Sequence, residues 1–155
     1  FPGGRLGGYA RLINQADLKG GQGVVVLPAL DEKILIQYNY RHPTRSWHWE
    51  VPRGFGDPGV LAEEQAYVEI REETGGKIQQ MVDLGSYHNN TGMEGVTTRL
   101  FFAQLKSVGE PAKEEGIEKF KWVTIEEFET LIRDGEITDG FTIAAYTRAK
   151  LRGLI

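Results

Sequence analysis

The 155-residue chain contains no cysteine, which excludes a disulfide framework, a thiolate-ligated metal site and a catalytic thiol. It also lacks any apolar run close to the ~20 residues that a membrane-spanning helix requires, and it opens without a signal-peptide pattern. These absences predict a cytoplasmic protein with no membrane partner. The chain begins with Phe1 rather than methionine, so a short N-terminal segment can be missing from it.

An excess of positive charge is absent as well. The chain has 18 Lys and Arg residues against 22 Asp and Glu residues, and its formal net charge is −4. A mildly acidic protein has no general electrostatic reason to hold nucleic acid through its phosphates, so no nucleic-acid partner is expected. The 40% hydrophobic and 26% charged residues are typical of one globular domain, which we predict to span residues 1–155.

Strand and helix signals alternate along the chain. β-Branched and aromatic runs predict strands. Residues 61–74, in which small or aliphatic residues recur every four positions, predict a helix that a pair of glycines ends. The predicted strands are 23–30, 33–41, 47–51, 77–87, 98–106 and 119–123, and further helices are predicted over 125–134 and 139–151. Mixed strands with one central and two terminal helices predict an α+β fold.

Three glutamates on the predicted central helix form a candidate metal site. Glu69, Glu72 and Glu73 are spaced i, i+3 and i+4, which places them on one stripe of an α-helix. Mutually repelling carboxylates suit a hard divalent cation such as Mg²⁺, which can clamp phosphate oxygens and activate water. The alternative is that the stripe is an ordinary solvated face, balanced by neighbouring basic residues.

The loop before this helix makes the metal interpretation more specific. Gly54 and residues 69–75 (EIREETG) follow the Nudix box, a pattern of G, five residues, E, seven residues and R-E-U-x-E-E-x-G-U, in which U is bulky and aliphatic. The segment therefore resembles Nudix hydrolases, which implies a mixed sheet sandwiched between helices and hydrolysis of a diphosphate with bound Mg²⁺ or Mn²⁺. The implied metal ligands are Glu69, Glu72, Glu73 and the backbone carbonyl of Arg53, the implied catalytic residue is Glu69, and the implied structural residues are Gly54 and Gly75.

Three positions depart from the box. Val60 stands where the pattern has its first Glu, Val68 where it has Arg, and Gly76 where it has an aliphatic residue. In the family that arginine is thought to orient the glutamate that follows it, here Glu69. Exchanging a whole ion pair for apolar packing can be neutral in free energy, whereas losing one partner strands a charge. We therefore expect the side chains of Val60 and Val68 to touch in the folded protein.

The segment upstream of the box resembles the ADP-ribose pyrophosphatase branch of the family. Residues 36–43 (IQYNYRHP) are similar to its Q-Y-R-Y-P segment, which implies that Arg41 lies near the substrate. Arg45 can pair with phosphate, and Trp47 can stack on a base or ribose, with packing in the core or an interface as the alternative. Glu50, from the segment that flanks the box, is the fourth expected substrate-binding residue.

The loop before the strand at 98–106 carries a second candidate catalytic residue. The branch has a glutamate before its F-x-A strand, and here Val96 stands at that position while Glu94 lies two residues earlier. A shift of the loop would let Glu94 orient or deprotonate the attacking water; a solvent-exposed acid is the alternative. Residues 137–145 (ITDGFTIAA) resemble the final helix of the branch, which often opens with D-x-x-T.

These patterns predict metal-dependent hydrolysis of a small nucleoside-diphosphate-linked substrate, of the ADP-ribose or nucleotide-sugar type. The competing hypothesis, which Val60 and Val68 favour, is a weakly active or inactive Nudix domain that binds a nucleotide ligand as a sensor or partner module. A third is an unrelated domain with a glutamate-rich helix. Retention of three repelling acids favours the enzyme. Relatives in this branch are often dimers, which implies a homodimer.

Overall fold

The computed structural model describes residues 3–4, 6–110 and 113–155. Its strands are β1 (Val24–Leu30), β2 (Lys33–Arg41), β3 (Ser46–Glu50), β4 (Arg53–Gly54), β5 (Lys77–Tyr87), β6 (Thr98–Ser107) and β7 (Ile117–Thr124). They form one mixed sheet in the order β3-β2-β1-β6-β5, with β4 paired to β1 and β7 paired to β2. The β1–β6 pair is parallel, and the other pairs are antiparallel.

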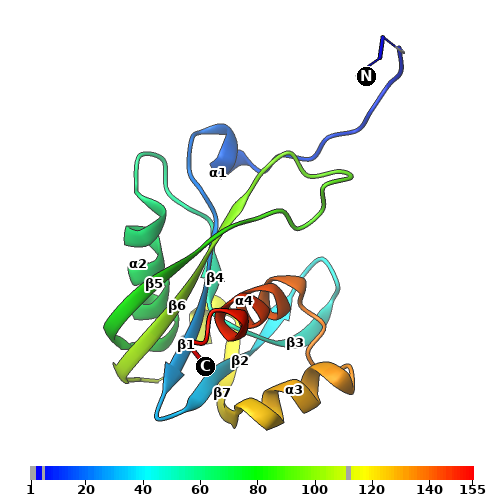
Figure 1. The fold of residues 1–155 in the computed structure, drawn as a ribbon. Helices are drawn as coiled ribbons and strands as arrows, with labels where there is room; N and C mark the ends of the chain where they lie inside the picture. Colours follow the sequence, from blue (N-terminus) through cyan, green and yellow to red (C-terminus); the bar gives the residue numbers. More distant parts are fainter. Residues whose placement is uncertain (1–2, 5, 111–112) are drawn as a thin grey trace.

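Helices cover both faces of the sheet (Figure 1). They are α1 (Gln15–Leu18), α2 (Ala62–Thr74), the 3₁₀ turn η1 (Lys113–Glu115), α3 (Ile125–Arg133) and α4 (Gly140–Leu151). Helix α2 packs on one face, where Ile70 joins Val24 and Val26 of β1 in a buried cluster. Helices α3 and α4 pack on the other, where Phe128 and Tyr146 join a second cluster. Strand β1 is apolar throughout because its alternate residues are buried on opposite faces.

Strands β1 and β2 separate after a tight hairpin. Asp31 (φ 50°) and Glu32 (φ 60°) form its two-residue turn in the left-handed region, and the strands pair only next to it, at Ala29↔Ile34 and Leu30↔Lys33. Farther along, β1 pairs with β4 instead, and this edge of β2 pairs with β3, while the other edge of β2 pairs with β7 from Lys33 onward. The sheet therefore opens where the box loop enters it, between the two strands (Figure 1).

Close backbone contact fixes the loop that leads from β4 into α2. A Cβ atom on Gly56 would lie 2.2 Å from the carbonyl oxygen of Gln22, so only glycine fits there. The Glu64 carboxylate accepts the Leu61 N–H at 3.3 Å at the start of α2. The helix ends at Thr74, and the following Gly75 has a left-handed φ of 60°, the conformation in which glycine commonly ends a helix.

The predicted architecture is confirmed, with differences at short elements. The strands over 33–41 and 77–87 have the predicted bounds, and Thr124 and Glu127 form the capping box of α3. Helix α1 and strand β4 were not predicted, because four-residue and two-residue elements carry no readable periodicity. The glycine-rich start of the chain, residues 1–8, lies partly outside the described residues. None of the described helices is long and apolar enough to cross a membrane.

Candidate active site

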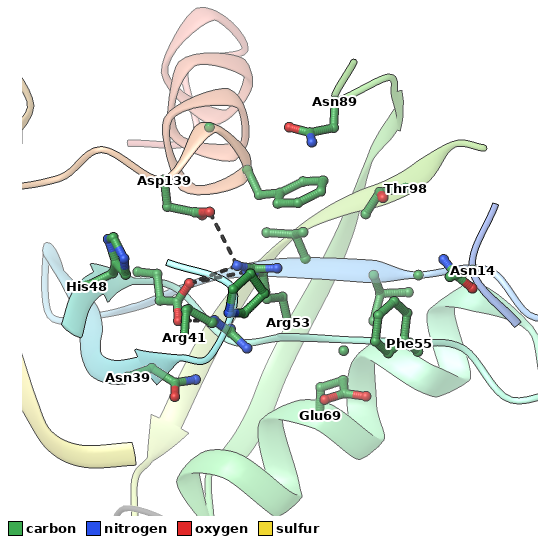
Figure 2. A pocket seen from close by; sticks show the side chains of 18 of the residues that line it. Asn14, Asn39, Arg41, His48, Arg53, Phe55, Glu69, Asn89, Thr98 and Asp139 are labelled. Atoms are coloured by element: carbon green, nitrogen blue, oxygen red, sulfur yellow. Dashed lines mark hydrogen bonds and ion pairs between the residues drawn. The ribbon is translucent and has the colours of Figure 1, made fainter. Parts of the chain in front are cut away.

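A cavity of about 1060 Å³ lies where β1 and β2 separate. Its walls come from the end of β2 and the turn after it, β4 with the start of the box loop, and one side of α2. The loop before β6 and the beginning of α4 also line it (Figure 2). The N-terminal segment with α1, the start of β1 and part of β3 contribute as well, so the fold brings segments from most of the chain to one opening of the sheet.

Carboxylates dominate the charged residues of this lining. Seven acidic side chains share it with two arginines: Asp17, Glu50, Glu69, Glu72, Glu73, Glu94 and Asp139, together with Arg41 and Arg53. The three glutamates of the predicted metal stripe, both candidate catalytic residues and the predicted Arg41 are therefore brought to one cavity.

Glu50 holds the two arginines in place. Its buried carboxylate accepts hydrogen bonds from Arg41 Nε at 2.7 Å and from Arg53 Nε and Nη2 at 3.2 and 3.1 Å. Arg53 also lies 3.4 Å from Asp139 and 5.0 Å from the ring centroid of Phe141, as Figure 2 shows for the ion pairs. A buried carboxylate with two cationic partners is electrostatically balanced, so Glu50 supports the arginines that line the cavity.

Glu73 lies on α2 in very different surroundings. Its side chain is 7% exposed, and its Oε2 accepts hydrogen bonds from Gln37 Nε2 at 3.0 Å and from the Arg53 N–H at 3.3 Å. Burial, reinforced by the nearby Glu69, raises the pKa of Glu73 to about 7. Ionisation of Glu73 at neutral pH is therefore costly unless positive charge is added.

Glu69 occupies a space that Gly54 leaves open. A Cβ atom on Gly54 would lie 2.2 Å from Glu69 Oε1, which explains why the box begins with glycine here. The carboxylate also accepts a hydrogen bond from Gln65 Nε2 at 2.8 Å. Figure 2 shows Glu69 rising from α2 toward the loop that carries Arg53 and Phe55.

Glu72 completes the stripe at the rim of the cavity. Its side chain is exposed and lies 3.4 Å from Arg71 Nη2, an ordinary surface pair. Within the described part of the chain, no three acidic or histidine side chains converge into a ready-made metal cage. The carboxylates thus share a cavity wall without already adopting the geometry of a bound ion.

The N-terminal segment holds the loop that carries Glu94. The Leu12 N–H donates to the Met93 carbonyl at 2.8 Å, and the Gly95 N–H donates to the Leu12 carbonyl at 3.2 Å. Glu94 itself is half-buried, lines the cavity and accepts a hydrogen bond from Asn89 Nδ2 at 3.2 Å. The loop geometry therefore brings Glu94 to the same cavity as Glu69.

Arg45 and Trp47 lie elsewhere. The cavity lining, over the residues that the structure describes, includes neither of them. His48 and Glu50 of β3 line the cavity, so strand alternation turns Trp47 to the opposite face, where it stacks on Tyr38 with a centroid distance of 5.3 Å. Arg45 is exposed in the turn before β3. The structure does not bring these two predicted substrate-binding residues to the site.

The two valines of the box are both half-buried. Val60 ends the box loop, where its N–H donates to the Asp57 carbonyl at 3.2 Å, and Val68 lies on α2. Neither side chain is fully exposed to solvent, but the expected contact between them stays a prediction.

Asp139, Thr142 and Gln65 shape the site, although none of them was predicted from the sequence as a site residue. Asp139 Oδ2 accepts hydrogen bonds from the N–H and hydroxyl of Thr142 at 2.9 and 2.7 Å, and this hydroxyl accepts the Val51 N–H at 3.1 Å. The D-x-x-T pattern was the available signal for this anchor of α4. No sequence motif marked Gln65. It lies one helical turn before Glu69, but this spacing predicts a role only once the structure shows the hydrogen bond between the two side chains.

Comparisons with known proteins agree with this fold and identify a family. Residues 19–143 match the NUDIX domain family. The chain is 28% identical over 129 residues to the CMP-5'-(N-acetyl-N-hydroxy-3-aminopropyl)phosphonate hydrolase of Streptomyces rubellomurinus, covering 79% of this chain but only 61% of that protein. It is 28% identical over 133 residues to the ADP-ribose pyrophosphatase of Bacillus subtilis, covering 83% and 72% of the two chains.

A solved structure shares the fold. The crystal structure of an ADP compounds hydrolase superposes with a TM-score of 0.73 at 20% sequence identity, covering 86% of this chain and 74% of that one. The family match extends over more than half of the chain and contains the whole box segment from Gly54 to Gly76. The chain belongs to the NUDIX domain family.

Proposed function

We propose that this chain hydrolyses the diphosphate bond of a small nucleoside-diphosphate-linked substrate, of the ADP-ribose or nucleotide-sugar type, with Mg²⁺ or Mn²⁺ as cofactor. Family membership and the similarity to two hydrolases of nucleotide-linked compounds support a pyrophosphohydrolase. The preference for ADP-ribose is supported by the segment around Arg41 and by the ADP-ribose pyrophosphatase relative.

The charge of the cavity is the observation that carries this proposal. Seven carboxylates line it against two arginines, and both arginines are already paired with Glu50. A diphosphate adds further negative charge, so its binding is opposed unless cations accompany it. Carboxylate oxygens such as those of Glu69 and Glu73 are the ligands that Mg²⁺ prefers. The donor set therefore fits a divalent cation.

The proposed roles follow from these positions. Glu69, Glu72, Glu73 and the backbone carbonyl of Arg53 hold the cation, which supplies charge neutralisation at the phosphate oxygens and a more acidic bound water. Arg41 Nη2 is buried and has no hydrogen-bond partner in the described structure, so it is available to donate to a phosphate oxygen. Glu94 accepts the proton of the attacking water.

Three observations favour a second candidate, a NUDIX domain that binds a nucleotide ligand without hydrolysing it. The described acidic residues form no ready-made metal cage, and Glu72 is paired with Arg71 at the surface. Val60 and Val68 also replace two charged positions of the box. In such a module the paired arginines would bind the ligand phosphates.

Phosphate-coupled hydrolysis assays separate the two candidates. ADP-ribose, nucleotide sugars and dinucleoside polyphosphates are incubated with the wild-type chain and with Glu73→Gln, with and without Mg²⁺. Turnover that needs the metal and is lost in the variant supports the enzyme. Background rates on every substrate, combined with saturable nucleotide binding by calorimetry, support the binding module. The homodimer remains a further proposal from the family resemblance, and light scattering of the purified chain tests it.

A further inference from the structure

Glu69 has closely fitting neighbours on two sides. On one side, Gly54 leaves the space for its carboxylate, because a Cβ atom there would lie 2.2 Å from Oε1. On the other side, Gln65 reaches the same Oε1 from one helical turn earlier and donates a hydrogen bond of 2.8 Å. The residue directly before Glu69 is Val68, which offers no side-chain donor. A carboxylate ligand needs such a partner to keep one orientation.

Gln65 is itself fixed in place. Its side chain is 5% exposed, and its Oε1 accepts the Asp57 N–H from the box loop at 3.4 Å. The flipped amide would direct its oxygen at the Glu69 carboxylate and its NH₂ group at the Asp57 N–H, and both contacts would be repulsive. Both neighbours therefore select the same amide orientation, and Gln65 links the box loop to the glutamate stripe.

We propose that Gln65 is a positioning residue: it holds the Glu69 carboxylate in its working orientation and so performs the task of the arginine that Val68 replaces. The inference rests on the proposed function, since it assigns Gln65 a part in a reaction that Glu69 carries. An amide orients the carboxylate without bringing a positive charge.

The first test exchanges Gln65 for methionine, which removes both hydrogen bonds at similar side-chain volume. We expect kcat of the Mg²⁺-loaded chain on its best substrate to fall about 10- to 100-fold, as happens when residues that orient metal ligands are lost. KM should change less than about twofold, because substrate contacts are retained. The exposed Gln79, exchanged for methionine on β5, is the matched control and should keep full turnover. Full turnover in Gln65→Met would overturn the proposal.

The second test restores the charged box in the variant. If Gln65 performs the task of the arginine, adding Val60→Glu and Val68→Arg to Gln65→Met should recover about tenfold or more of the lost kcat. The same pair of exchanges in the wild-type background should have little effect. A folded triple variant, judged by its melting temperature, that recovers nothing would contradict this assignment.

A third measurement does not depend on turnover or on the triple variant folding. NMR spectra of the metal-free wild type and the metal-free Glu69→Ala variant are compared. The ¹H–¹⁵N chemical shifts of the Gln65 side-chain amide should differ between the two proteins, whereas those of the Gln79 amide should be the same. Coinciding Gln65 signals would show that the hydrogen bond is absent in solution. A failure of the proposed function looks different, because the wild-type chain would then turn over no substrate. Turnover that Glu69→Gln abolishes and Gln65→Met retains would overturn only the positioning role.

Discussion

Two buried carboxylates in one cavity have opposite surroundings. Glu50 is 0% exposed and is paired with Arg41 and Arg53, whereas Glu73 is 7% exposed, accepts hydrogen bonds only from an amide and a backbone N–H, and has Glu69 near it as well as the charge of Arg41. Burial raises the pKa of Glu73 to about 7. The negative charge of Glu50 is therefore balanced within the folded chain. The α2 side of the cavity, around Glu73, has less positive charge than negative charge, which would favour binding of a cation.

Exchanging each carboxylate for an amide sharpens this comparison most. We expect Glu73→Gln to lower turnover on the order of 10³-fold, because a bound metal contributes several kcal/mol at the transition state, without destabilising the metal-free chain. Glu50→Gln should instead lower the free energy of unfolding by about 2–3 kcal/mol, because it removes the carboxylate partner of Arg41 and leaves Arg53 paired with Asp139 alone. Denaturant unfolding in EDTA and turnover in Mg²⁺ measure the two effects. Equal destabilisation by both exchanges would break the comparison.

The raised pKa of Glu73 also predicts how metal-free stability depends on pH. Its folded-state value of about 7 lies above the ordinary 4.5, so its ionisation opposes folding. The penalty is absent below about pH 4.5, grows as the pH rises and is complete above about pH 7, where it reaches at most about 3 kcal/mol. In EDTA, the unfolding free energy of the wild type relative to Glu73→Gln should therefore fall over this range. A difference that is constant with pH would contradict the proposed surroundings of Glu73.

Substitutions at Gly54 and Gly59 distinguish an effect on turnover, caused by displacing Glu69, from an effect on stability, caused by backbone strain. Gly54→Ala should displace the Glu69 carboxylate, which a Cβ atom would approach to 2.2 Å, and lower kcat about tenfold with little loss of stability. Gly59→Ala meets open space but a φ of +81°, so it should cost about 1 kcal/mol of stability and leave kcat unchanged. Steady-state kinetics and thermal melts of the two variants test this. The reverse assignment of effects would show that Glu69 does not need the space at Gly54.

The smallest functional effect is expected at Trp47, on the far face of the β2–β3 hairpin. Trp47→Ala removes the stacking on Tyr38 and should lower the free energy of unfolding by about 1 kcal/mol. It should leave KM within about twofold of the wild type, because the described cavity lining does not contain Trp47. A rise of KM by tenfold or more would indicate that Trp47 contacts the substrate after all.

Local patterns predicted those features that depend on one segment alone. The helix stripe that carries Glu69 and Glu73 follows from spacing, and the stop at Gly75 follows from the conformational freedom of glycine. The spacing of Trp47 and Glu50 in the sequence also predicts that only one of them lines the cavity. Residues 47 and 50 of one strand point to opposite faces, so they could not both line one cavity as regular strand residues.

Other features depend on contacts between distant segments. Beyond the hairpin, β4 takes the place of β2 beside β1, and β3 takes the place of β1 beside β2, and no local pattern encodes this opening. The pairing of Glu50 with Arg41 and Arg53 is likewise a product of the fold, because the β2–β3 register places Glu50 opposite Gln37 and not opposite Arg41. These contacts decide which carboxylates are balanced, so the charge difference across the cavity became visible only in the fold.

Uptake of a divalent cation by the glutamates of α2 is tested most directly by calorimetric titration of the full chain with Mg²⁺ and Mn²⁺ near pH 7. We expect saturable binding of the cation to the wild type, accompanied by proton release because Glu73 must ionise. Binding to Glu73→Gln should be weaker by about tenfold or more. Binding that is equal in both proteins, or absent from the wild type, would contradict the assignment of a metal site to this half of the cavity.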